Sequence, residues 1–148
     1  MVRIEKVSDL NRLDEIEVLE KLCFSDPYSI QMLKEDMSND HARYWILEID
    51  KKAVGYLSAW DVLGEIDLNR ICIIEGFRNK GAAGQLIDEL IKYAKGQKAN
   101  KIMLEVKESN LAAIKLYKKF DFEIIAERKA YYRDGSAAYV MERKIDEF

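Results

Sequence analysis

A short basic segment that contains glycine offers the clearest chemistry in the sequence. Residues 78–84 read Arg-Asn-Lys-Gly-Ala-Ala-Gly, between a strand-like stretch at 65–74 and a run of apolar residues at helical spacing. The first turn of a helix has unpaired N–H groups and the positive end of the helix dipole. Small side chains let a phosphate reach these amides, and Arg78 and Lys80 add positive charge. The segment therefore predicts a pyrophosphate site that needs no metal.

Two common phosphate loops do not fit this segment. It lacks the Gly-Lys-Ser/Thr ending of the Walker loop, and it lacks the three spaced glycines of the dinucleotide-binding fingerprint. A simpler interpretation also stays open, in which Gly81 and Gly84 only begin a helix while the two cations are solvated.

The segments around this site alternate between helical and strand patterns. One apolar stripe follows the basic segment, formed by Ala83, Leu86, Ile87, Leu90, Ile91 and Ala94. Helical spacing predicts further helices at 10–23, 29–37 and 111–120. Strands are predicted at 2–7, 44–49, 53–63, 65–74, 101–106, 123–132 and 137–144, with hairpin turns at Asp50-Lys51 and Asp134-Gly135.

This order of elements predicts an α/β fold. The strand-helix-strand-helix unit in the middle implies a central parallel pair, and the other connections are typical of hairpins. We therefore expect a mixed, mostly antiparallel seven-stranded sheet flanked by about four helices. No linker, repeat or low-complexity stretch divides the chain, so residues 1–148 are expected to form a single domain.

Composition narrows the class of protein further. The 148 residues are 49% hydrophobic and 34% charged, as in a globular chain, and the net charge of −3 argues against a nucleic-acid partner. No apolar run approaches the roughly 18 residues of a membrane span, and no signal peptide is visible. Two cysteines and one histidine argue against a disulfide scaffold or a metal site. We expect a cytoplasmic protein without a membrane partner, as a monomer or weak homodimer.

Three stretches together resemble motifs of the GNAT acetyltransferases. Arg78-x-x-Gly81-x-Ala83 is similar to the Gln/Arg-x-x-Gly-x-Gly/Ala signature of that family. Residues 104–122, LEVKESNLAAIKLYKKFDF, resemble its second signature, in particular that of the RimI branch, which acetylates N-terminal alanine of ribosomal proteins. Ard1-type N-α-acetyltransferases share much of this run, and residues 130–141 resemble the ending of both branches. The resemblance covers nearly the whole chain and implies the GNAT fold.

The resemblance also implies a reaction and a cofactor. The acetyl group of acetyl-CoA would pass to the α-amino group of a protein N-terminus by direct attack in a ternary complex, with a ribosomal protein as one candidate acceptor. Acetyl-CoA would lie between strands 65–74 and 101–106, without a metal. The resemblance assigns the pantetheine contacts to Ile71, Cys72 and Ile73, the pyrophosphate contacts to Arg78, Asn79, Lys80, Gly81, Ala82, Ala83 and Gly84, and a further contact to Asn110.

Two residues match the proton-transfer pair of the RimI branch, Glu105 as general base and Tyr117 as general acid. The chemistry independently needs such a pair, because an N-terminal amine has a pKa near 8 and a thiolate leaves better when it is protonated. Structural alternatives remain for each residue. Glu105 could be a surface carboxylate, Tyr117 a core residue, Asn110 only a helix cap, and Cys72 a small buried hydrophobe.

The acceptor site is implied by two further segments. Tyr131 and Tyr132 would form a wall that holds the acceptor N-terminus, although both could serve only in hairpin packing. Residues 25–28, Ser-Asp-Pro-Tyr, stand near the place of an acidic loop in Ard1-type enzymes. Asp26 is therefore a second candidate for the base or for an acceptor contact, and Tyr28 is a candidate acceptor contact.

Two departures from the family pattern bear on these assignments. Ser136 and Ala137 stand where the family usually has Glu-Asp, so an acceptor contact from that aspartate is lost. Asp121 replaces the usual glycine before Phe122, which puts the end of the preceding helix in doubt. Two other functions remain open: acetylation of a small-molecule amine or a lysine side chain by the same fold, and binding of an acyl-CoA without turnover.

Overall fold

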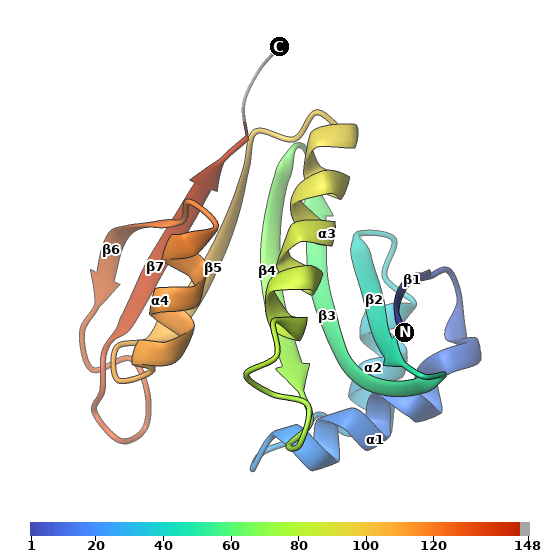
Figure 1. Ribbon diagram of the computed structural model, residues 1–148. Coiled ribbons are helices and arrows are strands. Elements are labelled where there is room, and N and C mark those ends of the chain that lie inside the picture. Colours follow the sequence, from blue (N-terminus) through green and yellow to red (C-terminus); the bar gives the residue numbers. More distant parts are fainter. Residues whose placement is uncertain (146–148) are drawn as a thin grey trace.

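The computed structural model describes residues 1–145, which form one mixed sheet with helices on both faces (Figure 1). The sheet order is β1-β2-β3-β4-β5-β7-β6, and β4 and β5 are its parallel pair. The strands are β1 (Val2–Val7), β2 (Ala42–Ile49), β3 (Lys52–Val62), β4 (Glu65–Ile73), β5 (Lys101–Lys107), β6 (Glu123–Arg128) and β7 (Ala138–Lys144). The helices are α1 (Leu13–Cys23), α2 (Ile30–Met37), α3 (Ala82–Gly96) and α4 (Leu111–Lys119). The predicted fold class is confirmed.

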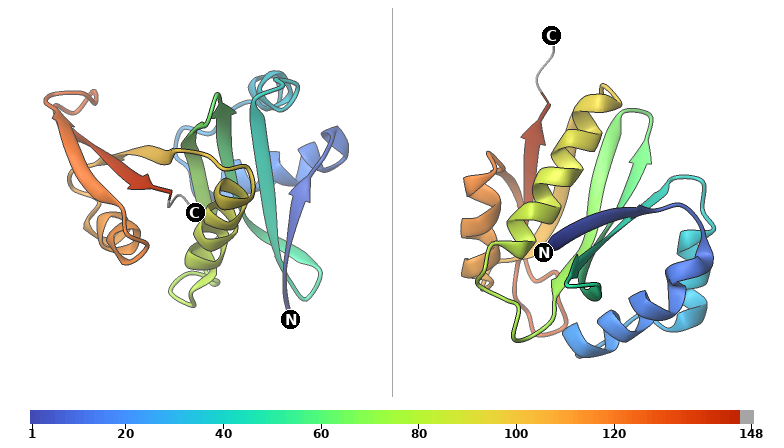
Figure 2. Two further views of the ribbon diagram at one scale, coloured as in Figure 1. Left: turned by 90° about the horizontal axis from the view of Figure 1, so that it is seen from above. Right: turned by 45° about the vertical axis from the view of Figure 1, so that its right-hand side comes forward.

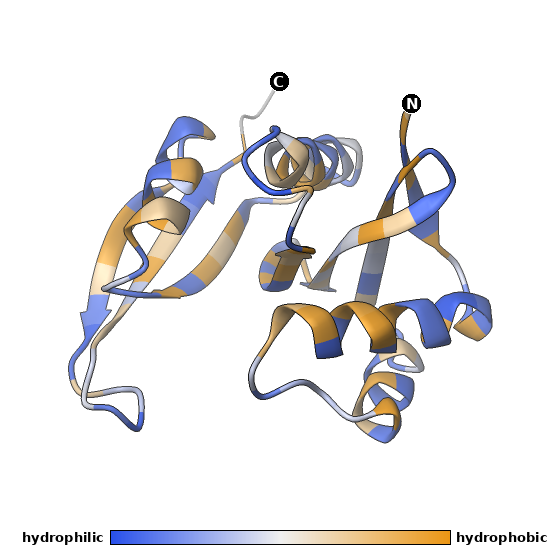
Figure 3. Ribbon diagram, turned by 60° about the horizontal axis from the view of Figure 1, so that its bottom comes forward, coloured by the Kyte–Doolittle hydropathy of each residue, from blue (hydrophilic) through white to orange (hydrophobic). Residues whose placement is uncertain are grey.

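The helices form two layers on opposite faces of the sheet. α3 and α4 lie on one face, and α1 and α2 lie on the other (Figure 2). Hydrophobic and hydrophilic residues alternate along α1 (Figure 3), and its inner face buries Ile16 and Leu19 while Val18 and Leu22 are exposed. In the described part of the chain, no helix is long and apolar enough to cross a membrane.

The central strands are buried on both faces because both helical layers cover them. Tyr44 of β2 faces α2, where its hydroxyl donates to Asp36, whereas the next residue, Trp45, packs edge-on against Tyr93 of α3 at 5.3 Å between ring centroids. α3 supplies the opposite wall through the predicted stripe, of which Leu86, Ile87, Leu90, Ile91 and Ala94 are buried and Ala83 is half-buried. These contacts confirm the helical period read from the sequence.

The parallel pair β4–β5 is joined along only part of its length. Its ladder pairs Glu65 with Lys101, Ile66 with Ile102 and Asp67 with Met103, and then ends. Beyond this point β4 pairs with β3 and β5 pairs with β7, so the two strands diverge (Figure 1). Strand backbone that faces such an opening needs another hydrogen-bond partner. The opening therefore suits an extended ligand.

A β-bulge accompanies the divergence. Leu68 pairs with Ala59 and Arg70 pairs with Ser58, so Asn69 is the extra residue of β4. A bulge bends its strand and changes which face the following side chains occupy. As a result, Asp67 and Arg70 both lie on the α1–α2 face, where each lines or supports a cavity described below.

Two element boundaries differ from the sequence prediction in ways that affect the site. β6 ends at Arg128 rather than at 132, and β7 begins at Ala138 rather than at 137. The residues between them form a closed loop instead of a tight hairpin, because the Tyr132 N–H donates to the Ser136 carbonyl and Ala130 has φ of 51°. Predicted strand residues Tyr131 and Tyr132 therefore lie in this loop.

Other local predictions hold with small shifts. The first helix begins as a 3₁₀ turn, Leu10–Arg12, before α1 starts at Leu13, and Asp9 caps this turn by accepting from the Asn11 N–H at 2.8 Å. Asp50 and Lys51 form the predicted turn between β2 and β3, both with positive φ. Asp121 adopts φ of 67°, so it takes the left-handed conformation that ends α4 without the usual glycine.

Candidate active site

A cavity of about 580 Å³ opens between β4, the start of α3 and α4. Eleven of its lining residues come from the predicted basic segment and α4: Arg78, Asn79, Gly81, Ala82, Ala83, Gly84, Ala112, Ala113, Lys115, Leu116 and Lys119. Ile71, Cys72 and Ile73 of β4 form another wall. The structure therefore brings together most of the residues that the sequence analysis assigned to a cofactor. Lys80 and Asn110 are the exceptions, since neither lines this cavity.

The N-terminus of α3 faces this cavity without a side-chain cap. Its N-cap residue is Gly81, with φ of 80° and no capping side chain. Asn79, also with positive φ, lies just before it. Arg78 fixes the loop to the sheet, because its Nε donates to the Ile73 carbonyl at 2.7 Å. The amides of the first helical turn are left for an external acceptor, which is the arrangement that binds phosphate at a helix N-terminus.

Gly84 is required by a close approach between helices. A Cβ at this position would come within 3.1 Å of the Phe120 ring at the end of α4. The absence of a side chain therefore lets α3 and α4 pack closely beside the 580 Å³ cavity, which is called the cofactor-side cavity below. The glycine that the sequence analysis placed at a phosphate also serves helix packing.

Asn110 acts as the N-cap of α4. Its side-chain oxygen accepts from the Ala113 N–H at 3.2 Å, as the sequence predicted. Lys80 is exposed in the loop before α3. The contacts that these two residues would make with a cofactor stay predictions.

Glu105 lies on the opposite side of the opening. It lines a cavity of about 440 Å³ with Asp67, Asn69, Arg128 and Tyr131. Its carboxylate is 36% exposed, and Oε1 lies 3.7 Å from Arg128 Nη2. Met103, Leu104 and Glu105 of β5 line this cavity, and Leu104 and Val106 are otherwise buried in the core. Glu105 therefore lines a cavity that solvent reaches, and this cavity is called the Glu105 groove below.

The two loop tyrosines lie beside Glu105. Tyr131 lines the same cavity and packs edge-on against Tyr132, with 5.3 Å between ring centroids. Burial and the negative charge of Glu105 raise the pKa of Tyr132. Lys107 binds Asp134 at 2.5 Å and holds the loop in place, and it lowers the pKa of Asp134 well below the usual range.

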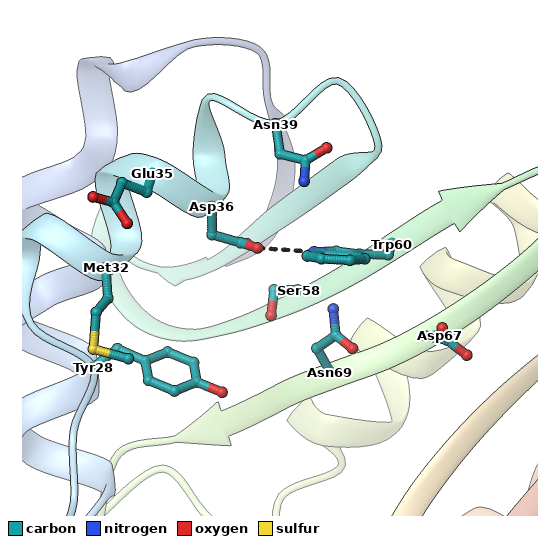
Figure 4. A pocket seen from close by; sticks show the side chains of 9 residues that line it. All are labelled: Tyr28, Met32, Glu35, Asp36, Asn39, Ser58, Trp60, Asp67 and Asn69. Carbon is teal, nitrogen blue, oxygen red and sulfur yellow. Dashed lines mark hydrogen bonds between the residues drawn. The ribbon is translucent and has the colours of Figure 1, made fainter.

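A second cavity on this face was not foreseen. It has a volume of about 690 Å³, and it meets the Glu105 cavity at Asp67 and Asn69, which line both. Figure 4 shows its walls from α2, β3 and β4. The remaining lining residues are Tyr28, Met32, Glu35, Asp36, Asn39, Ser58 and Trp60. No motif marks these residues, because strand pairing and the bulge at Asn69 bring them together from four separate segments.

A buried ion pair places Tyr28 at this second cavity. The carboxylate of Glu20 in α1 is fully buried, and it accepts from Arg70 Nη2 at 2.9 Å and Nε at 3.0 Å. The Tyr56 hydroxyl and the Tyr28 N–H also donate to it. The Arg70 guanidinium lies between the rings of Phe24 and Tyr28, at 3.8 and 4.0 Å from their centroids. The Glu20 carboxylate therefore links Arg70 of β4 to the loop after α1.

These donors set the ionisation of Glu20. Burial alone would raise its pKa, but the hydrogen bonds from Arg70, Tyr56 and the Tyr28 N–H outweigh burial and lower the pKa below its usual range. The carboxylate is therefore ionised in the folded protein at neutral pH.

Asp26 does not lie where the sequence analysis expected a base. Its side chain is exposed, and it lines neither of the cavities that contain Tyr28 and Glu105. Only its backbone carbonyl takes part in this region, by accepting from Arg70 Nη2 at 3.3 Å. A direct role for the Asp26 carboxylate stays a prediction.

Tyr117 lies on the buried face of α4, with 6% of its surface exposed, and its ring packs against Phe122 at 5.7 Å between centroids. Burial raises the pKa of Tyr117 to about 12. Its hydroxyl has no hydrogen-bond partner among residues 1–145, although every fully enclosed side-chain oxygen or nitrogen in that range is paired. The hydroxyl is therefore protonated at neutral pH and available to an external acceptor.

Cys23 and Cys72 are free thiols, and Cys72 is buried as expected of a small apolar residue. Within residues 1–145, no group of three or more His, Cys, Asp or Glu side chains is arranged to hold a metal ion.

The fold and these two facing sites define an acetyltransferase of the GNAT type, and comparison with known proteins agrees. Residues 11–122 match the model of the acetyltransferase (GNAT) family, so the chain belongs to that family.

Individual relatives narrow the resemblance to enzymes named for N-terminal acetylation. A [ribosomal protein bS18]-alanine N-acetyltransferase of Haemophilus ducreyi is 32% identical over 132 residues, covering 86% of this chain and 87% of the relative. An N-alpha-acetyltransferase of Saccharolobus solfataricus is 28% identical over 149 residues, covering 92% and 89%. The crystal structure of the ribosomal-protein-S18-alanine N-acetyltransferase from Escherichia coli superposes with a TM-score of 0.92 at 24% identity, covering 100% of this chain and 96% of that one.

We predict that Glu20→Gln lowers the free energy of unfolding at pH 7 by about 3 kcal/mol, because it leaves the buried Arg70 charge without its counterion. The lowered pKa of Glu20 stabilises the folded protein above its unfolded pKa of about 4.3, and this contribution is lost as pH falls through the folded value. The difference between wild type and variant should therefore be constant from pH 7 to 5 and shrink below about pH 4. Denaturant unfolding at several pH values measures it.

Glu17→Gln is the matched control, because Glu17 lies one turn earlier on α1 and pairs only with the exposed Lys21 at 3.6 Å. It should change stability by less than about 0.5 kcal/mol. Equal effects of the two substitutions would contradict a structural role for the Glu20–Arg70 pair.

Proposed function

We propose that this protein transfers the acetyl group of acetyl-CoA to the α-amino group of a protein N-terminus. The observation that carries the proposal is the opening between β4 and β5, which has the cavity at the uncapped N-terminus of α3 on one side and the Glu105 groove on the other. A cofactor and an amine can thus approach the same gap from opposite faces and react directly. The names of the full-length relatives support an N-terminal amine as acceptor.

The charges and the exposed strand backbone of the cofactor-side cavity support acetyl-CoA as its ligand. The uncapped N-terminus of α3 and the cations Arg78 and Lys80 suit a pyrophosphate, and Lys115 and Lys119 of α4 add positive charge at the same cavity. Beyond Asp67, the edge of β4 presents the backbone of Ile71–Ile73 to the opening, where an amide-rich pantetheine arm would find partners. When bound, acetyl-CoA supplies an activated thioester.

Glu105 is the proposed general base. It faces the opening from β5, in a groove that solvent reaches, so it can take a proton from an ammonium directly or through one water. Arg128 Nη2 lies 3.7 Å from Glu105 Oε1 at the same cavity. Tyr131 and Tyr132 would hold the backbone of the acceptor beside it.

Tyr117 is the proposed general acid. Its protonated hydroxyl has no hydrogen-bond partner within residues 1–145. Since Tyr117 belongs to α4, which lines the cofactor-side cavity, this hydroxyl can donate to a departing thiolate. Its raised pKa of about 12 keeps the proton on the oxygen until the negative charge of the leaving group develops. Because this pKa is above that of a thiol, about 8.5, Tyr117 would stabilise the developing thiolate by donating a hydrogen bond, and the amine-derived proton released to solvent balances the final thiol.

The acceptor is proposed to be a ribosomal or other cytoplasmic protein that begins with a small residue, and the enzyme to act as a monomer or weak homodimer. One experiment tests the function most directly. Peptides that begin with Ala, Ser and Met, each with an internal lysine, are incubated with acetyl-CoA and sequenced by mass spectrometry. Acetyl groups on the N-terminal nitrogen support the proposal. Acetylation of lysine alone, or of spermidine but no peptide, would assign another acceptor to this fold, and no transfer would indicate binding without turnover.

We predict that Glu105→Gln lowers kcat at pH 7 by ~10²-fold, the usual scale for loss of a general base. The defect should shrink as pH rises toward 9, because more of the acceptor amine is then already neutral. Steady-state rates on a peptide substrate between pH 6 and 9 measure both effects.

Glu127→Gln, an exposed carboxylate on the outer strand β6, is the control and should retain wild-type kcat. Wild-type kcat for Glu105→Gln at pH 7 would move the base role to Asp26 or to water.

We predict that Tyr117→Phe slows the acetyl-transfer step by roughly 10- to 10⁴-fold while Tm and acetyl-CoA affinity change little. The ring and its contact with Phe122 are retained, and only the hydroxyl is removed. Single-turnover rates and thermal unfolding measure the two properties separately.

Tyr117→Ala separates packing from chemistry. It should cost about 3 kcal/mol or more of stability, because it opens a cavity at a buried aromatic position. An active Phe variant beside a destabilised Ala variant would show that Tyr117 contributes only packing.

A further inference from the structure

The cavity beneath α2 lies outside the machinery described for acetyl transfer. It holds about 690 Å³, far more than the methyl group of an N-terminal alanine would fill. It opens into the Glu105 groove at Asp67 and Asn69, so a chain whose amine lies at Glu105 can extend into it. Each further residue of an extended peptide covers about 3.5 Å, which brings the second or third residue within reach.

Three carboxylates give this cavity its charge. Glu35, Asp36 and Asp67 all line it, and none of them forms an ion pair with a lysine or arginine within residues 1–145. Lys101, a cation close to Asp67, instead pairs with Glu65 and Glu142. A negative cavity without internal cations attracts a positive group from outside.

A serine hydroxyl in the cavity wall points to a ligand independently of the charge. Ser58 is only 3% exposed and lines the cavity, and since every fully enclosed side-chain oxygen within residues 1–145 is paired, its unpaired hydroxyl is reached from the cavity itself. Figure 4 shows it between Tyr28 and Asn69, directed into the space that the three side chains share. The hydroxyl is therefore free to accept a hydrogen bond from a donor that enters the cavity.

The aromatic wall suits a cation as well. Asp36 accepts from the Trp60 Nε1–H at 2.8 Å and from the Tyr44 hydroxyl, so the indole is held in one orientation. Trp60 remains 36% exposed along the cavity. An ammonium or guanidinium can lie against the indole face while it donates to the nearby carboxylates.

We propose that this cavity binds the cationic side chain of a lysine or arginine in the first three residues of the acceptor peptide. Ser58, Asp67 and Glu35 receive its N–H groups, and Trp60 covers its alkyl stem. The inference rests on the proposed function, because it needs a peptide whose α-amine lies at Glu105. It assigns the cavity to substrate selection rather than to the chemical step.

The test compares peptides that begin with alanine and carry Arg, Lys, Gln or Glu at position two or three. At saturating acetyl-CoA and low salt, kcat/KM should favour Arg or Lys over Gln by about tenfold, and Glu should be the poorest. The preference should weaken in about 0.5 M salt, because screening acts on exposed charges. Ser58→Ala should raise KM for the basic peptides without lowering Tm, whereas a purely structural serine would lower Tm.

The double variant Asp67→Asn with Glu35→Gln should abolish most of the preference for basic peptides. Asp88→Asn, which removes a charge from α3 on the opposite face, is the control and should retain the preference. Equal rates with Arg and Gln peptides, or a preference that survives the double variant, would overturn the inference while leaving the proposed function intact. Absence of acetyl transfer to every peptide would overturn both.

Discussion

The end of the β4–β5 ladder at Asp67 and Met103 is the constraint on which the site depends. A continuous parallel pair would satisfy its own backbone and close the sheet, and no ligand could then meet an amine across it. The bulge at Asn69 and the separate partners of the two strands, β3 and β7, keep the opening in place. The structure thus leaves strand hydrogen-bonding groups of β4 and β5 unpaired with one another beyond this point, where the proposed function places the cofactor.

The second constraint joins the two halves of the acceptor site. Glu20, Arg70 and the backbone of Tyr28 form one hydrogen-bonded unit that fixes the loop after α1 against β4. A buried ion pair contributes little net stability relative to an apolar core, but it becomes costly once one partner is removed. Its value here is geometric, since the same unit that closes the core positions Tyr28 in the wall of the cavity beneath α2.

Sequence patterns predicted the elements well and the acceptor site only in part. The helical stripe of α3, the parallel pair and the basic loop follow from local periodicity and turn chemistry, and the structure confirms them. The cavity with Ser58, Trp60 and Asp67 had no local signal, because strand register and a one-residue bulge create it. The sequence pattern predicts a hairpin strand at Tyr131, but the structure has a loop there. The loop is closed by a hydrogen bond between Tyr132 and Ser136 that residue composition does not predict.

Charge is divided across the sheet in a way that affects the reaction itself. Cations line the cofactor side, at Arg78, Lys115 and Lys119, whereas carboxylates line the acceptor side. The carboxylates attract a positively charged N-terminus, but they also favour its protonated form and so oppose attack. In the proposed reaction, a base at the opening would resolve this conflict, because it would remove the proton where the amine meets the thioester. Arg128, 3.7 Å from Glu105, would reduce the local negative charge that holds the proton on the amine.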